Sequence, residues 1–119
     1  MEVYNGTPHE LVLVDPRDRK TIVARIPPSR VIRAREESLA TDRIVVEETT
    51  FPVVIKTYGK PEGLPQRQND RIIVVSAIAY QAIKENYPER AGPDGDVRMT
   101  NDRVRDRNGQ IIGFCTFAC

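Results

Sequence analysis

A short apolar run that leads directly into a helical pattern constrains the fold of this sequence more than any other feature. Residues 72–75 form a continuous β-branched run, which is typical of a central strand buried on both faces. Ser76 follows in the position of a helix N-cap, and Pro88 ends the helical pattern. The sequence therefore predicts a strand over 71–75 and a helix over 77–86. Five residues at helical spacing form its predicted buried side: Ile78, Ala79, Ala82, Ile83 and Tyr87.

Frequent turn signals divide the rest of the chain into short segments rich in β-branched residues. Further strands are predicted over 10–14, 20–26, 31–35, 42–50, 51–58, 103–106 and 111–117. The pair Asn108-Gly109 is a strong hairpin-turn signal between the last two. Six to eight short strands with one helix predict a mainly β (α+β) fold, a compact antiparallel or mixed sheet or a barrel-like domain. A length of 119 residues fits a single domain, 1–119.

The charge balance excludes several classes of partner. Lys and Arg total 18 and Asp and Glu total 17, giving a net charge of +1. A surface for extended nucleic-acid or membrane binding usually carries a large basic excess, so this balance argues against both. The apolar runs are too short to span a bilayer, and the first residues lack the pattern of a signal peptide. We therefore expect a cytoplasmic location, which is the host cytoplasm if the protein is viral.

Several motifs spread along the chain form a recognisable set. The sequence opens with Asn5-Gly6-Thr7-Pro8-His9 and closes with residues 104–115, Val-Arg-Asp-Arg-Asn-Gly-Gln-Ile-Ile-Gly-Phe-Cys. Between them lie Ile26-Pro27-Pro28-Ser29, Tyr58-Gly59, Gly63-Leu64-Pro65 and Ile73-Val74-Val75-Ser76. In this order the set resembles a family of small uncharacterised proteins of phages, prophages and bacterial genomes that open with Asn-x-Thr-Pro-His.

The resemblance covers most of the chain and has two departures. The family often has Gly after Pro-Pro-Ser, where this chain has Arg30, and it tends to place Gly and Cys together near the end, where Phe114 intervenes. The resemblance implies a viral or mobile-element origin, and it brings no established activity with it.

His9 is the only histidine, so any imidazole chemistry must use it. One hypothesis makes it a general base or a ligand-binding donor in a site shared with Asn5 and Thr7. The alternative, which we favour, is that Thr-Pro-His organises a turn in which Asn5 and Thr7 bond to local backbone.

Cys115 and His9 suggest a second hypothesis, a thiolate–imidazole nucleophile pair of a small hydrolase or transferase. The apolar pattern around Cys115 favours an inert, buried thiol instead. The two cysteines, Cys115 and Cys119, are expected to be reduced. No nucleophile elbow surrounds Ser76, and no metal or cofactor motif is present, so we predict neither a metal site nor a cofactor.

Arginines give the strongest binding signal. Arg103, Arg105 and Arg107 alternate, so in a strand they share one face and form a cationic row suited to phosphate or carboxylate oxygens. The alternative, which we favour, is a solvated edge partly paired with the neighbouring Asp102 and Asp106.

A second anion-binding hypothesis rests on Ser76, because a helix N-terminus after a central strand presents free backbone N–H groups. The loop over 59–70 is long and rich in Gly, Pro and polar residues, and such loops often carry binding sites. If that loop covers the helix start, Tyr58 can stack on a ring while Ser76 and an arginine hold a phosphate.

These patterns favour binding over catalysis. The leading hypothesis is a viral or mobile-element accessory protein that binds a host component, either a small anionic, nucleotide-type ligand or a host protein. The alternatives are the hydrolase or transferase that uses His9 and Cys115, and a structural virion or assembly subunit. The last of these predicts a homo-oligomer in which a β edge such as 51–57 pairs between chains.

Overall fold

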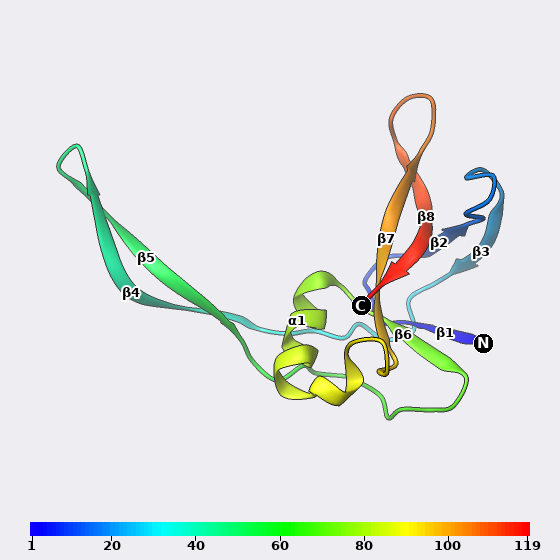
Figure 1. Cartoon of the computed structure of the whole chain (residues 1–119), viewed down its shortest axis with the longest axis horizontal. Coiled ribbons are helices and arrows are strands. Elements are labelled where there is room, and N and C mark those ends of the chain that lie inside the picture. Colours follow the sequence, from blue (N-terminus) through cyan, green and yellow to red (C-terminus); the bar gives the residue numbers. More distant parts are fainter.

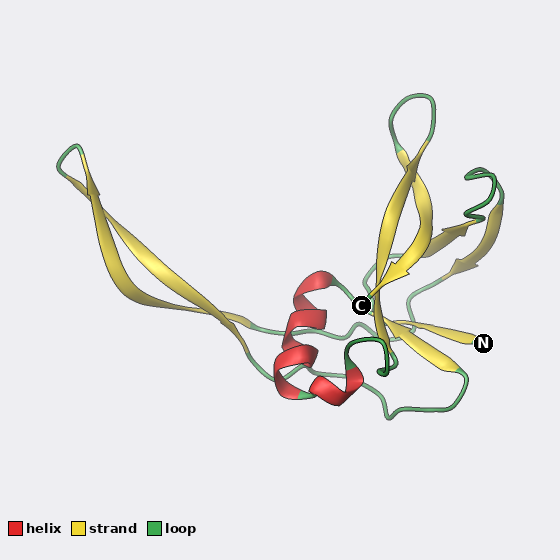
Figure 2. Ribbon diagram, in the orientation of Figure 1, coloured by secondary structure: helices red, strands yellow, loops and turns green.

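The computed structural model describes all residues 1–119 and contains eight β-strands, one α-helix and one 3-10 helix (Figures 1 and 2). The strands are β1 (Glu2–Asn5), β2 (Leu11–Val14), β3 (Ile22–Ile26), β4 (Glu36–Val46), β5 (Thr49–Tyr58), β6 (Arg71–Val74), β7 (Val97–Arg105) and β8 (Ile111–Ala118). The helices are α1 (Ala77–Asn86) and the 3-10 turn η1 (Pro88–Arg90).

Six of the strands form one mixed, nearly closed sheet in the order β1-β6-β7-β8-β2-β3, and β4 pairs only with β5. The predicted mainly β class and the helix over 77–86 are therefore confirmed. None of the helices has the length and apolar character needed to cross a membrane.

The predicted strand-to-helix step lies at the centre of the core. β6, α1 and β7 form a βαβ unit, because β7 returns parallel to β6. Ser76 caps α1, and its Oγ accepts from the backbone N–H of Ala79 at 3.3 Å. The core cluster joins the two strands, the helix and one residue of the segment before β4: Ile32, Ile73, Val75, Ala79, Tyr80, Ile83 and Val97.

The prediction that Ile78 lies on the buried side of the helix was wrong. Ile78 is 45% exposed, whereas Tyr80, which the spacing did not select, is 4% exposed. Tyr80 is held inside by its hydroxyl, which accepts from the backbone N–H of Gly92 at 3.0 Å. A buried tyrosine needs such a partner, so the loop after η1 decides which side of α1 faces the core.

Two strand predictions differ from the structure for the same reason. Residues 2–5 carry no strong strand pattern, yet they form β1 by pairing in parallel with β6. Residues 31–35 have the pattern but make only an isolated bridge, Arg33 to Glu62. Pairing between segments distant in the sequence determines both outcomes.

An ion pair fixes the loops around η1. Arg90 and Asp96 meet at 2.7 Å with side-chain exposures of 14% and 4%. The Arg90 guanidinium also donates to the carbonyl of Pro65 at 2.8 Å, so one side chain connects the long loop, η1 and the start of β7.

The hairpin of β4 and β5, here called the arm (residues 36–58), projects from the rest of the chain (Figure 1). It extends the molecule to 55 × 40 × 23 Å, and the radius of gyration of 17.7 Å exceeds the about 13.5 Å expected of a compact domain of this length. The sequence predicted strands over 42–50 and 51–58, but the turn lies at Glu47 and Glu48, and β4 begins six residues earlier, at Glu36.

Substituting Asp96→Asn tests the role of the buried ion pair. Removing one charge leaves the Arg90 guanidinium largely buried without a counter-ion, and we expect the free energy of unfolding to fall by about 3 kcal/mol. Chemical denaturation would measure it. The control is Asp94→Asn, two residues away and exposed, which should change stability by less than about 0.5 kcal/mol. Equal effects of the two substitutions would contradict the assigned role.

Candidate functional site

The motif that opens the sequence forms a hydrogen-bonded turn around one buried amide. The side chain of Asn5 is fully buried, and its Nδ2 donates to the carbonyls of His9 at 2.7 Å and Ile26 at 2.9 Å. Its Oδ1 accepts from the backbone N–H and the hydroxyl of Thr7, at 2.9 and 2.7 Å. Asn5 and Thr7 thus bond to neighbouring backbone, in the manner of the turn alternative.

This turn brings two loops together at one edge of the sheet. β1 and β6 are parallel neighbours, so the loops that follow them leave from the same edge. Between these loops, β7 and β8 lies a cavity of about 380 Å³. Its polar lining consists of Thr7, His9, Glu10, Ser76, Thr100 and Arg103. Its apolar lining consists of Pro8, Leu11, Val75, Ala77, Met99 and Phe114.

The cavity favours negative charge. The Arg103 guanidinium forms no ion pair within the chain. Ser76 and Ala77 bring the N-terminus of α1 to the lining, where backbone N–H groups without helical partners face outward. The one carboxylate in the lining, Glu10, is paired with Arg25 at 3.1 Å.

The structure brings together four of the residues that the sequence singled out: Thr7, His9, Ser76 and Arg103. Asn5 is buried outside this lining, and its side-chain amide is already engaged in hydrogen bonds with the turn. Tyr58 lies at the base of the arm and is absent from this lining. The long loop lines a different cavity, together with Tyr87 and Arg90.

The predicted arginine row is shorter than expected. β7 ends at Arg105, and Arg107 lies in the turn that follows, so the three arginines do not share one strand. The Arg105 guanidinium donates to the carbonyl of Gly109 at 2.7 Å and is occupied within the hairpin. Of the three, only Arg103 lines the cavity.

The sequence reasoning missed the apolar wall of the cavity. Met99 and Phe114 reach it from β7 and β8, whose antiparallel register places Phe114 opposite Arg103. The Asn108-Gly109 turn predicts this hairpin, and counting back from it gives the pairing of Arg103 with an aromatic residue to within one position.

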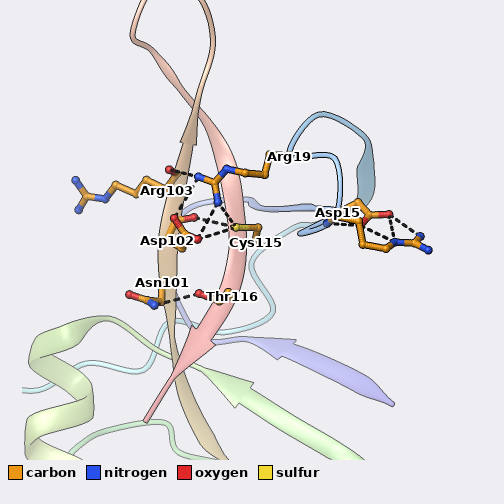
Figure 3. Close-up of polar contacts among 8 residues, drawn as sticks. Asp15, Arg19, Asn101, Asp102, Arg103, Cys115 and Thr116 are labelled. Atoms are coloured by element: carbon orange, nitrogen blue, oxygen red, sulfur yellow. Dashed lines mark hydrogen bonds and ion pairs between the residues drawn. The ribbon is translucent and has the colours of Figure 1, made fainter.

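Successive side chains of β8 point to opposite faces of the sheet. Phe114 lines the cavity together with His9, so its neighbour Cys115 lies on the other face. Its thiol lies against Arg19 and Asp102, on the side of β7 opposite to that on which the Arg103 side chain extends (Figure 3). The Arg19 guanidinium donates to the Cys115 sulfur at 3.2 Å and pairs with Asp102 at 2.8 Å. Arg19 and Asp102 both have left-handed backbones, with φ of 58° and 53°.

The surroundings of Cys115 do not activate it. Burial raises the pKa of its thiol, and the hydrogen bond to the Asp102 carboxylate raises that pKa further, while the Arg19 guanidinium lowers it. The Asp102 pKa is itself held below its ordinary value, first by the hydrogen bond from Arg19. A nucleophilic cysteine needs the opposite shift, and this geometry gives no support to a Cys115–His9 pair.

These features define a small, mainly β domain with one βαβ unit and a cavity at the carboxyl ends of β1 and β6. Comparisons with protein-family models, with curated proteins and with solved structures find no match to the chain. No group of three or more His, Cys, Asp or Glu side chains is placed to hold a metal ion.

Alkylation tests the state of Cys115, with the exposed Cys119 as an internal control. At pH 7 we expect iodoacetamide to modify Cys119 faster, because the raised pKa keeps Cys115 as a thiol. Asp102→Asn should speed the modification of Cys115, since it removes the anion, and Arg19→Gln should slow it. Peptide mass spectrometry over time measures both rates. Faster modification of Cys115 than of Cys119 in the unaltered chain would favour the nucleophile instead.

Proposed function

We propose that this domain binds a small anionic, nucleotide-type ligand in the cavity at the carboxyl ends of β1 and β6, without transforming it. The observation that carries the proposal is the meeting of an unpaired arginine, a helix N-terminus and an aromatic ring in one lining. Each of these groups serves a different part of such a ligand.

The anionic part is served by Arg103 and by the start of α1. A guanidinium holds phosphate or carboxylate oxygens through two parallel N–H groups, and free backbone N–H groups at a helix start add further donors. His9 is exposed, and its imidazole can add a donor or an acceptor at the rim of the cavity.

The ring of the ligand is served by the apolar wall. Phe114 provides the stacking surface for which Tyr58 was predicted, and Met99 and Leu11 provide the neighbouring apolar surface. A volume of about 380 Å³ suits a mononucleotide-sized molecule. A mostly apolar lining with a few convergent polar groups is the usual composition of such sites.

The resemblance to small phage and prophage proteins supports a role as a viral or mobile-element accessory protein. Capture of a small host metabolite is a task that a 119-residue binding domain can perform without catalytic groups. The absence of activation at Cys115 favours this binding role over the hydrolase alternative.

Ligand screening tests the proposal. Thermal shift would be measured with inorganic phosphate, mono- and dinucleotides and cyclic nucleotides, followed by calorimetric titration of any hit. A ligand at a hundred times its Kd stabilises the folded chain by about 2.7 kcal/mol, which raises the melting temperature by about 10 °C. Arg103→Gln should weaken the affinity by about tenfold to a hundredfold, because it removes a charged hydrogen-bond donor.

The matched control is Arg107→Gln, which makes the same change in the turn outside the cavity. We expect this variant to bind like the unaltered chain. The proposal fails if no compound shifts the melting temperature, or if the two arginine variants lose affinity equally.

A further inference from the structure

The arm has one strongly apolar face. In its register Leu39 pairs with Ile55, Ile44 with Phe51, and Asp42 with Val53, and paired residues lie on the same face. Alternation along both strands then places six apolar side chains on this face, here called the apolar face: Leu39, Ile44, Val46, Phe51, Val53 and Ile55. The opposite face is mixed: Ser38, Arg43, Thr50 and Lys56 alternate there with Ala40, Val45 and Val54.

Five of these six side chains are exposed, and only Val53 is half-buried. Every residue of β4 is exposed, and Leu39, Ile44 and Ile55 are 68%, 56% and 54% exposed. A two-stranded hairpin alone is marginally stable in water, and it needs further strands or a packed face to persist. An apolar face of this size on an isolated hairpin is typical of an interaction surface.

We propose that the apolar face is covered by the same face of a second copy of this chain, so that two arms pack face to face in a two-fold symmetric dimer. Burying an apolar side chain of this size removes about 100 Å² from water. Six side chains in each of two copies give about 1,200 Å², which is the lower limit for a stable protein–protein interface.

The residues outside the arm, 1–35 and 59–119, are here called the body. The apolar face of one chain fits the arm of another copy better than it fits the body of another copy. The exposed large apolar residues of the body are fewer and divided among the N-terminus, β3, α1 and β8: Met1, Ile22, Val23, Ile78, Ile111 and Phe117. Only the arm carries six apolar side chains along one face, interrupted on β4 by Asp42 and bridged there by its partner Val53 on β5. A two-fold axis presents this face to itself, which closes the assembly at two chains.

Charge sets the direction of the arms. The tip carries Glu47 and Glu48, so a parallel arrangement would bring four carboxylates together. An antiparallel arrangement brings each tip to the base of the other arm, which is preceded by three arginines without ion pairs: Arg30, Arg33 and Arg35. The base also carries Glu37 and the Glu36–Lys56 ion pair, so three arginines against one unpaired carboxylate leave a net positive charge there for the other tip.

The edges of the arm are poor docking sites, in contrast to its face. Pro52 interrupts β5 because it has no N–H to donate, and a register shift between Ala40 and Asp42 disturbs β4. Both features discourage the edge pairing over 51–57 that a virion subunit was expected to use. Neither feature hinders packing through the apolar face.

Sedimentation of the full chain over a range of concentrations tests the dimer. We expect a mass of two chains, and Ile44→Thr with Phe51→Thr should raise the dimer Kd at least about a hundredfold, because four apolar side chains are lost from the interface. The control is Val45→Thr with Val54→Thr, which also introduces two threonines but on the opposite face, and it should alter Kd by less than about threefold. Circular dichroism checks that the body stays folded in each variant.

Charge reversal tests the antiparallel direction. Glu47→Lys with Glu48→Lys, and separately Arg33→Glu with Arg35→Glu, should each weaken self-association by placing like charges at the tip–base contact. A mixture of the two variants should form a heterodimer with restored affinity, since each tip then meets an opposite charge.

Three results would overturn the proposal. The first is a full-length chain that stays monomeric at about 100 μM, well above the Kd of a stable interface. The second is equal weakening by the apolar-face variant and its control. The third is a mass that grows without limit with concentration, which would indicate an open assembly in place of a closed dimer. Unchanged self-association of both charge variants would overturn the antiparallel direction.

Discussion

The rest of the body depends on the hydrogen bonds that the buried side chain of Asn5 makes. Its amide makes four hydrogen bonds that join the end of β1, the following turn and the end of β3. The neighbouring backbone extends this network, because Gly6 donates to Val74 of β6 and accepts from Ile32. A buried amide costs free energy unless its donors and acceptors are satisfied, so this arrangement selects one path for the chain.

The same network positions the candidate site. Holding the loop after β1 against the end of β6 leaves His9 and Ser76 at one edge, over the middle of β7. Gly6 permits the close approach, since a Cβ there would lie 2.6 Å from a side-chain carbon of Ile32 and 3.0 Å from the carbonyl of Val74. The opening motif therefore acts on the cavity by shaping it, and its polar atoms are largely occupied in doing so.

The sequence correctly predicted the features that depend on interactions between residues close in the sequence. The strand-to-helix step at Ser76 and the hairpin turn at Asn108-Gly109 rest on capping and turn chemistry, and both are present. β1 and the position of Tyr80 depend on partners distant in the sequence, and so does the meeting of the β7–β8 hairpin with the loops after β1 and β6. The turn at Glu47 and Glu48 was missed because both residues adopt φ values of 48° and 67°, a conformation usually taken by Asn or Gly.

The two proposals rest on separate parts of the molecule. The cavity belongs to the body and shares no residue with the arm, whereas the apolar face of the arm contributes nothing to the core cluster. Two left-handed glutamates at the tip cost conformational energy that Asn-Gly would avoid, which is consistent with a role for their charges outside the hairpin. A hairpin that packs on no other strand gains stability from association, so in the proposed dimer the order of the arm would depend on protein concentration, whereas the cavity lies wholly within one chain.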